Sequence, residues 1–351
     1  MSQSSRVVLG PSPIDVKRLS NAFCHAKLLL TAGELGLFSD LEEHGPSSQG
    51  EIVARIGLHP RAARDFLHGL VLLGLLELDA GRYRNTQSAS ATLVPGKPDY
   101  VGGFLYRANH MLYPAWGRLT EALTTGAPQT AGAADEGAFL RMLADPTQRE
   151  QYLRMMDSAN SLVAPHLIEQ FDWAGHRRVL DVGGCRGNLA GLLMRAYPHL
   201  EAGVFDLPPL AGPHAEHAER LGVADRAWFL AGDFFADELP PGEIVILGHV
   251  LHNWSPEQRA ELIAKAYRAV EPGGALLIYD AMLPEEPSDL ARILISLNML
   301  LVTEGGSEYT SRECLSWLAA AGCADTEVRP LGTTDTLVIG RKPASPERPT
   351  P

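Results

Sequence analysis

Cysteine is scarce in this sequence, and its few cysteines form no pattern. The 351 residues contain four, at positions 24, 185, 314 and 323. This spacing includes neither a C-x-x-C pair nor the arrangement of a zinc site. We therefore expect reduced thiols rather than a disulfide framework or a structural metal.

Long apolar runs are also missing. The longest nearly apolar stretches, Gly69 to Leu76 and Ile293 to Val302, are far shorter than the ~20 residues that cross a bilayer. Both predict core helices, and we expect no membrane partner. Residues 1–13 lack the basic and then apolar pattern of a secretory signal, so a cytoplasmic location is expected.

The sequence has fewer basic than acidic residues. The chain has 30 Lys and Arg against 42 Asp and Glu, a net charge of −12, and no run of five basic residues interrupts this balance. Such a chain repels a phosphate backbone, so nucleic acid is not an expected partner. Hydrophobic residues make up 45% of the sequence, which is enough for a substantial core, and the length favours two structural units.

The N-terminal part has the pattern of amphipathic helices. Apolar residues recur at helical spacing between Asp15 and Leu41, which predicts helices that need a partner surface. Helices around Gly50 to Ile56 and Arg61 to Leu73, followed by a hairpin that turns at residues 79–81, are typical of a winged helix. The second of these helices carries few basic residues, so a scaffold role is favoured over DNA binding.

After residue 177, short β-branched runs alternate with helical stretches, as in a parallel sheet with crossover helices. The expected strands are Arg178 to Val182, Ala202 to Phe205, Ala227 to Leu230, Ile244 to Leu247, Ala275 to Tyr279, Thr326 to Arg329 and Thr336 to Gly340. We therefore expect an α/β domain at residues 175–343, a helical domain at residues 1–174 and a disordered tail at residues 344–351.

A glycine turn follows the first expected strand, in Arg178-Val-Leu-Asp-Val-Gly-Gly-Cys-Arg-Gly187. Glycines allow a ligand to approach the backbone closely. Their spacing here differs from the G-x-G-x-x-G that cradles a pyrophosphate, which argues against NAD. Asp206 ends the second strand, where it can accept hydrogen bonds from ribose hydroxyls. Asp233 and Phe234 follow the third strand, where they can bracket an adenine.

His252 follows the fourth strand, and Ser255-Pro-Glu-Gln258 predicts that a helix begins directly after it through a capping box. A phenol of pKa ~10 needs a base to become nucleophilic at neutral pH, and histidine can serve as one. His252 is nevertheless one of 12 histidines, and His249 is only three positions away. On the residues alone, an ordinary surface or core histidine remains the alternative.

Five segments resemble, in order and approximate spacing, the motifs of the S-adenosylmethionine-dependent O-methyltransferases that act on small aromatic molecules. These enzymes include the plant caffeate-type enzymes and their bacterial natural-product relatives. The segments are Leu180-Asp-Val-Gly-Gly184, Phe205-Asp-Leu-Pro208, Gly232-Asp-Phe234, Val250-Leu-His-Asn-Trp254 and Gly305-Gly-Ser-Glu308. The resemblance implies a Rossmann-like class I methyltransferase domain and an N-terminal winged-helix-like domain. The latter would form an intertwined homodimer and a lid over the substrate.

The resemblance also assigns site residues. It implies that His252 is the general base and that Asp280 and Glu308 are its acidic partners. The residues implied for the cofactor, S-adenosylmethionine, are Asp181, Gly183, Gly184, Gly187, Asp206, Leu207, Asp233, Phe234, Gly248, Met156 and Asn160. Asn253, Asn298 and Met299 are implied for the aromatic acceptor, although Met299 is equally explained as a core methionine. No metal is implied.

Three positions depart from the family pattern. Cys185 stands where a third glycine is usual, which places a side chain beside the cofactor turn and predicts weaker cofactor binding. Asn253 replaces the aspartate that commonly follows the family's histidine, and Gly248 stands where plant relatives carry a lysine. Neither of these two removes the catalytic histidine.

Two alternative functions stay open. The first is a relative on the same fold that catalyses hydroxylation, decarboxylation or cyclisation, and retention of His252, Asp280 and Glu308 counts against it. The second is a winged-helix transcriptional regulator, which the acidic charge disfavours. Richness in alanine, glycine, leucine and arginine favours a bacterial origin and therefore an acceptor from secondary metabolism, including antibiotic biosynthesis.

Overall fold

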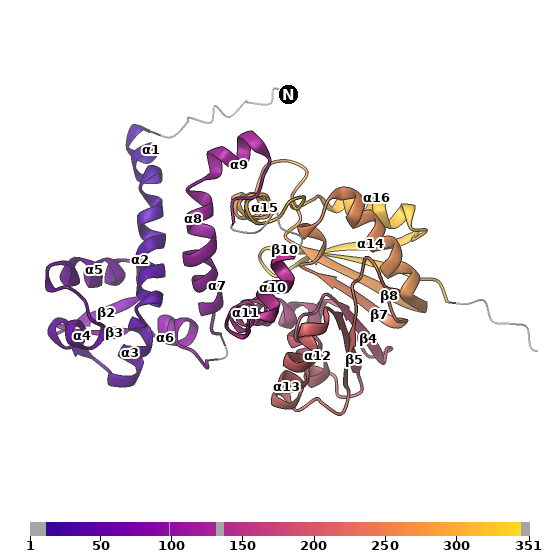
Figure 1. The fold of residues 1–351 in the computed structure, drawn as a ribbon, viewed down its shortest axis with the longest axis horizontal. Helices are drawn as coiled ribbons and strands as arrows, with labels where there is room; N and C mark the ends of the chain where they lie inside the picture. The colour runs from indigo at the N-terminus through magenta and orange to yellow at the C-terminus, as the bar shows by residue number, and fades with distance from the viewer. Residues whose placement is uncertain (1–11, 98, 131–136, 345–351) are drawn as a thin grey trace, which may run out of the picture. The chain divides into compact units, whose positions relative to one another are not determined.

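The structure is a computed structural model that describes residues 12–97, 99–130 and 137–344 (Figure 1). The chain forms two compact units, residues 1–110 and residues 111–351. Apart from Ala344, the predicted tail lies outside the described residues, as do residues 1–11 of the segment searched for a secretory signal. Among the residues described, no helix is both long and apolar enough to cross a membrane.

The first unit combines helices with a small antiparallel sheet of order β1-β3-β2. Its elements are α1 (Pro13–Ser20), α2 (Ala22–Glu34), α3 (Leu37–His44), β1 (Ser47–Ser48), α4 (Gln49–Ile56), α5 (Pro60–Leu72), β2 (Leu76–Asp79), β3 (Arg82–Asn85), α6 (Gln87–Leu93) and α7 (Gly102–Arg107). Strands β2 and β3 form the predicted hairpin, with Leu78 opposite Tyr83. Leu37, Ile52 and Leu67 belong to a core of this unit's own. The predicted helices and hairpin are present, whereas the comparison with a winged helix stays a prediction.

A π-helical turn (Ala108–Leu112) leads into the second unit. Its helices are α8 (Tyr113–Trp116), α9 (Leu119–Thr125), α10 (Ala138–Ala144), α11 (Pro146–Gln170), α12 (Asn188–Ala196), α13 (Ala211–Leu221), α14 (Pro256–Ala269), α15 (Leu290–Val302) and α16 (Ser311–Ala320). Its strands are β4 (Arg178–Val182), β5 (Glu201–Asp206), β6 (Ala227–Ala231), β7 (Gly242–Gly248), β8 (Val270–Asp280), β9 (Asp325–Leu331) and β10 (Asp335–Arg341). Every predicted strand is therefore confirmed.

These strands form one sheet of order β6-β5-β4-β7-β8-β10-β9 within the described part of the chain. The first five strands in this order are parallel, and β10 and β9 are antiparallel to their neighbours. The chain proceeds from β4 to one edge through β5 and β6, and then to the other through β7 and β8. Ligands of open α/β sheets bind at the carboxyl ends of the strands where the order reverses, here between β4 and β7.

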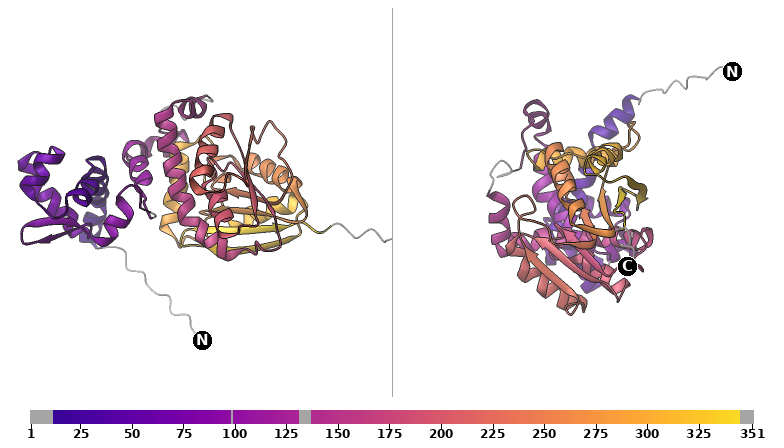
Figure 2. Two further views of the ribbon diagram at one scale, coloured as in Figure 1. Left: turned by 90° about the horizontal axis from the view of Figure 1, so that it is seen from below. Right: turned by 90° about the vertical axis from the view of Figure 1, so that its right-hand side faces the viewer.

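Helices cover both faces of the sheet (Figures 1 and 2). Side chains alternate between the faces along each strand, so Val179 packs in one core cluster and Leu180 in the other. Helices α11, α12 and α13 contribute to the first cluster, and α14 and α16 contribute to the second. The expected α/β architecture is confirmed. The predicted boundary between domains near residue 174 stays a prediction. The compact unit that contains the sheet also includes the helices between residues 111 and 170.

Candidate active site

The glycine turn between β4 and α12 is tightly packed. A Cβ on Gly183 would lie 2.8 Å from Cγ2 of Val250, and one on Gly184 would lie 2.4 Å from Oδ2 of Asp181. Gly183 has a φ of +75° and Gly187 a φ of +76°, a region that side chains disfavour. All three predicted glycines are therefore needed for this turn, which presents bare backbone at the carboxyl end of β4.

Two buried carboxylates lie against the turn. Asp206 accepts hydrogen bonds from the backbone N–H groups of Cys185 (2.8 Å) and Leu207 (2.7 Å). Asp181 is 3% exposed, and its Oδ2 has no hydrogen-bond partner among the described residues. Burial raises the pKa of Asp181 to about 7 and that of Asp206 to about 6, although the two backbone donors oppose the shift at Asp206. A buried acceptor without a donor fits a ligand that supplies one, such as the ammonium group of S-adenosylmethionine.

An aromatic ring lies on the other side of this turn. A Cβ on Gly183 would be 3.8 Å from the ring of Phe234, which follows β6 and stands perpendicular to Trp254 at a centroid distance of 5.7 Å. Asp233, the preceding residue, is exposed, and one of its oxygens accepts a hydrogen bond from the N–H of Phe235 (2.8 Å). An apolar ring beside the glycine turn, with a carboxylate next to it in the chain, suits an adenine.

Gly248 ends β7 and makes room for a tyrosine. A Cβ there would lie 2.1 Å from the ring of Tyr279, which is opposite Gly248 in the parallel register and 1% exposed. The space next to the backbone, where plant relatives carry a lysine, is thus taken by an aromatic ring from β8. Glycine is required here because of this neighbour.

Helix α11 carries two predicted cofactor contacts, of which Met156 packs near the same turn. Met156 packs against a buried cluster that includes Cys185, and Asn160 lies one turn further along the helix at 5% exposure. Arg186, which is buried in the glycine turn, forms an ion pair with the half-buried Asp157 of α11. This pair ties the helix to the turn.

Cys185 adopts the left-handed conformation of the glycine that it replaces. Its φ is +53°, its side chain is 4% exposed, and its Sγ lies 3.6 Å from the hydroxyl of Tyr152. The thiol packs with Leu153 and Leu210 in an apolar cluster. The predicted weakening of cofactor binding stays a prediction.

His252 lies in a short helical turn after β7, with both predicted acidic partners at one ring nitrogen. Its Nδ1 is 2.7 Å from Oε1 of Glu308 with hydrogen-bond geometry, and 3.2 Å from Oδ1 of Asp280 without it. Asp280 ends β8, is fully buried, and accepts a hydrogen bond at Oδ2 from the hydroxyl of Tyr309 (2.7 Å). This arrangement holds a proton on Nδ1 and leaves Nε2 as the basic nitrogen.

The carboxylates also set the charge of the imidazole. Burial lowers the pKa of His252, but Asp280 and Glu308 outweigh burial and raise it above the ordinary value of 6.5. Burial raises the pKa of Asp280, and the nearby His252 opposes that shift. His252 is therefore a stronger base than a free histidine, but it loses its proton only at a higher pH.

Arg259, which the sequence analysis did not single out, joins the loops that carry His252 and Glu308. Its guanidinium is 2% exposed and donates to the backbone oxygens of Leu251 (3.1 Å) and Ser307 (2.6 Å). These residues directly precede His252 and Glu308. The predicted capping box begins α14 as expected and places Arg259 in the first turn of that helix.

The three predicted acceptor residues differ in their surroundings. Asn298 of α15 accepts a hydrogen bond at Oδ1 from the indole N–H of Trp116 (2.7 Å). Met299, its neighbour, is 5% exposed, which also suits a core residue. The amide of Asn253 donates to the backbone oxygens of His249 and Val250, both at 3.2 Å, and so braces the loop that carries His252.

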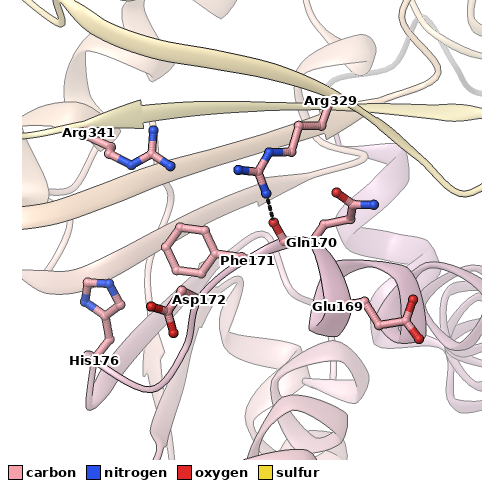
Figure 3. Close-up of a pocket in the computed structure, with 7 residues that line it drawn as sticks. All are labelled: Glu169, Gln170, Phe171, Asp172, His176, Arg329 and Arg341. Carbon is pink, nitrogen blue, oxygen red and sulfur yellow. Dashed lines mark hydrogen bonds between the residues drawn. The ribbon is translucent and has the colours of Figure 1, made fainter.

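A separate hollow lies near the opposite end of the strands (Figure 3). It is lined by the segment that leads into β4, including His176, and by Arg329 and Arg341 of the antiparallel strands. Arg341 pairs in register with Ala275, early in β8. Both arginines form ion pairs with the single carboxylate of Glu327, which balances one of their two positive charges. This hollow holds none of the predicted site residues.

Comparison with known proteins identifies the family. Residues 116–324 match the model of the O-methyltransferase domain, and residues 17–95 match that of the O-methyltransferase dimerisation domain. The chain is 44% identical over 333 residues to the tetracenomycin polyketide synthesis 8-O-methyl transferase TcmO of Streptomyces glaucescens, covering 94% of this chain and 97% of that protein. The chain belongs to the O-methyltransferase family.

Two further comparisons agree with this assignment. The N,N-dimethyltransferase OxyT of Streptomyces rimosus is 36% identical over 329 residues, covering 93% of this methyltransferase and 95% of OxyT. The crystal structure of human N-acetylserotonin methyltransferase in complex with S-adenosylmethionine superimposes with a TM-score of 0.87 at 29% identity, covering 96% of this methyltransferase and all of that chain.

The expected enzyme class, fold class and cofactor are confirmed: the protein is an S-adenosylmethionine-dependent O-methyltransferase with an N-terminal dimerisation domain. Neither the non-methylating alternative nor the transcriptional regulator is favoured by these comparisons. The individual roles of the site residues stay predictions.

The raised pKa of His252 predicts a pH dependence. In its predicted role as the base, His252 has to be unprotonated, so kcat/KM should fall on the acid side with an apparent pKa above 6.5. Glu308→Gln removes a charge that raises the pKa of His252, so the acid limb should move to lower pH while the maximal rate falls. The matched control is Glu304→Gln, an exposed carboxylate four residues earlier, which should leave the limb in place. An acid limb that stays unmoved in Glu308→Gln would show that this carboxylate does not control the base.

Proposed function

We propose that this methyltransferase uses His252 as the general base in methyl transfer to a phenolic or enolic hydroxyl of an aromatic polyketide. The observation that carries the proposal is the 2.7 Å hydrogen bond between Nδ1 of His252 and Glu308. A proton held at Nδ1 leaves the lone pair of Nε2 free to accept another. S-adenosylmethionine supplies an electrophilic methyl group when bound, so the protein has to position the acceptor and remove its proton.

Each group of residues has one task in this account. His252 accepts the hydroxyl proton at Nε2, and Asp280 and Glu308 stabilise the resulting imidazolium. Asn298 and Met299 position the ring of the acceptor, and Asn253 supports the loop of His252. The cofactor is held by Met156, Asn160, Asp181, Gly183, Gly184, Gly187, Asp206, Leu207, Asp233, Phe234 and Gly248. The orphaned oxygen of Asp181 supports this assignment most directly, because it lacks a donor among the described residues.

Oxygen is the favoured acceptor atom, although the name of one relative refers to methylation of nitrogen. A phenol has to lose its proton to become a good nucleophile, whereas a neutral amine attacks with its own lone pair. A base supported by two buried carboxylates is therefore most useful for a hydroxyl. The name of TcmO, which refers to polyketide synthesis, supports an acceptor of that class and a place in secondary metabolism. The cytoplasmic location expected from the sequence stays a proposal.

We further propose that the protein is a homodimer formed through residues 17–95 and the helices next to them. Large apolar side chains on α1 and α2 are exposed, including Leu19 (76%) and Phe23 (55%). Burial of such a surface against a second copy removes it from water. Light scattering after gel filtration should give twice the monomer mass. An active species of monomer mass at micromolar concentration would contradict the proposal.

The base assignment predicts the behaviour of His252→Ala. Turnover should fall by roughly 10²- to 10⁴-fold, the usual contribution of general-base catalysis, while the rise in Tm on binding S-adenosylmethionine stays unchanged. Raising the pH should restore part of the rate, because a phenol ionises in solvent as the pH approaches ~10.

The control is His199→Ala, which removes an exposed histidine whose Nε2 lies 3.2 Å from the backbone oxygen of Trp173, away from the site. It should keep normal turnover. Near-normal turnover in His252→Ala would mean that proximity alone drives the reaction.

A substitution of Asp206 tests the proposed cofactor site. Asp206→Asn keeps the shape of the side chain but removes its charge, so we expect affinity for S-adenosylmethionine to fall about 10- to 100-fold, in line with hydrogen bonds to charged groups. The increase in Tm with the cofactor should shrink accordingly, and NAD should give no increase in either protein. Asp225→Asn, at an exposed carboxylate before β6, is the control. A full increase in Tm in Asp206→Asn would remove this residue from the site.

Metal dependence is a sharp test because His252, Asp280 and Glu308 have possible ligand atoms within 4.8 Å of one another. In our account Nδ1 carries a proton toward Glu308 and is not a metal ligand. Turnover should therefore be the same with and without a chelator. Activity that is lost in EDTA and restored by Mg²⁺ would contradict the general-base mechanism.

A further inference from the structure

His249 has a strained backbone at the edge of the site. It directly follows β7 and has a φ of +53°. Among the described residues, only Ala80 and Cys185 share a positive φ without being glycine; the first lies in the hairpin turn and the second in the glycine turn. Such conformations cost free energy and persist where surrounding contacts enforce them, often at functional sites.

Contacts on three sides fix the ring of His249. Its Nε2 is 3.2 Å from Oδ2 of Asp335, the first residue of β10, and the two side chains are 17% and 10% exposed. The ring lies within 11° of parallel to that of His252, with centroids 5.8 Å apart. The ring of Tyr279 meets it edge to face at 5.0 Å.

The imidazoles of His249 and His252 both lie beside a carboxylate, but they need opposite charge states. In each ring, one nitrogen lies beside a carboxylate: Nε2 of His249 beside Asp335, and Nδ1 of His252 beside Glu308. The other nitrogen, Nδ1 of His249 or Nε2 of His252, is not one of the buried atoms that lack a hydrogen-bond partner. Since neither atom bonds to another described residue, both face accessible space.

Burial lowers the pKa of His249, but Asp335, with smaller contributions from Asp280 and Glu308, raises it to about 9. His249 is therefore cationic at neutral pH, where the base has to be neutral.

We propose that His249, held by Asp335, is an oxygen-binding subsite for the acceptor, in which Nδ1–H donates to a carbonyl or ionised hydroxyl oxygen next to the hydroxyl that is methylated. The acceptor class is an aromatic molecule whose reacting hydroxyl is flanked by a second oxygen, as in hydroxyketones and hydroxyquinones. The cation stabilises negative charge that spreads over both oxygens when His252 removes the proton. The inference rests on the proposed function, because it takes His252 to face the same acceptor.

The alternative is that the pair of His249 and Asp335 only joins β7 to β10. A purely structural pair would affect stability and would treat all acceptors equally. A subsite instead makes the enzyme discriminate between acceptors with and without the second oxygen.

The test compares two probes, 8-hydroxy-1-tetralone, whose hydroxyl is flanked by a carbonyl, and 1-naphthol, which lacks the second oxygen. Their dissociation constants are measured by calorimetry with S-adenosylhomocysteine present, and methylation is followed separately by mass spectrometry. The variants are His249→Asn, because asparagine tolerates a positive φ, and Asp335→Asn, which keeps the imidazole but removes its partner's charge. His176→Asn, in the hollow of Figure 3, is the matched control.

We expect the wild-type protein and His176→Asn to bind the tetralone at least tenfold more tightly than 1-naphthol. His249→Asn should lose about 10- to 100-fold in affinity for the tetralone and less than about threefold for 1-naphthol. Asp335→Asn should lose part of the preference. Equal affinity for the probes in the wild-type protein, no binding of either, or an unchanged preference in His249→Asn would overturn the subsite. Absence of methylation despite a preserved binding preference would contradict the proposed function instead.

Discussion

The candidate site is organised around two carboxylates buried against one imidazole nitrogen. Asp280 is fully buried and Glu308 is 4% exposed, so water does little to stabilise their charges. His252 is the group beside them that can carry a compensating positive charge, and the hydroxyl of Tyr309 binds one of the remaining oxygens. The loops around the site have to hold these charges together, since a buried carboxylate that loses its partner is strongly destabilising.

The parallel sheet provides most of that support. Strands β7 and β8 are parallel neighbours, so the loop of His252, which follows β7, lies beside Asp280 at the carboxyl end of β8. Glu308 arrives from a distant loop, and Arg259 fixes this loop to that of His252 through two backbone oxygens. Val250 in turn packs against Gly183 of the cofactor turn. The glycine turn and the loop of His252 therefore occupy adjacent carboxyl ends, at the point where the strand order reverses.

What could be predicted from the sequence was local or followed from topology. The bounds of β4 were predicted because an apolar β-branched run ends in glycines, and the beginning of α14 was predicted from its capping box. Parallel strands bring their carboxyl ends together, so the proximity of His252 to Asp280 followed from the assignment of two strands. The resemblance added Glu308, which no spacing rule would have found.

Other contacts between distant segments could not be predicted. The partner of His249 comes from β10, 86 positions later by residue number, and is set by the antiparallel addition of that strand. Glycine is required at position 248 because the ring of Tyr279, from the neighbouring strand β8, fills the space that a side chain would need. The positive φ of Cys185 and His249 likewise depends on packing, because a positive φ is uncommon for any residue with a side chain.

The central claim is that the carboxylates keep a proton on Nδ1 of His252 and leave Nε2 as the titrating nitrogen. Nitrogen-15 NMR of histidine-labelled protein, with His252 assigned by substitution, measures both atoms as the pH is varied. The account predicts that Nδ1 stays protonated throughout and that Nε2 loses its proton with a pKa above 6.5. Loss of the proton from Nδ1 instead, or a pKa below 6.5, would contradict it.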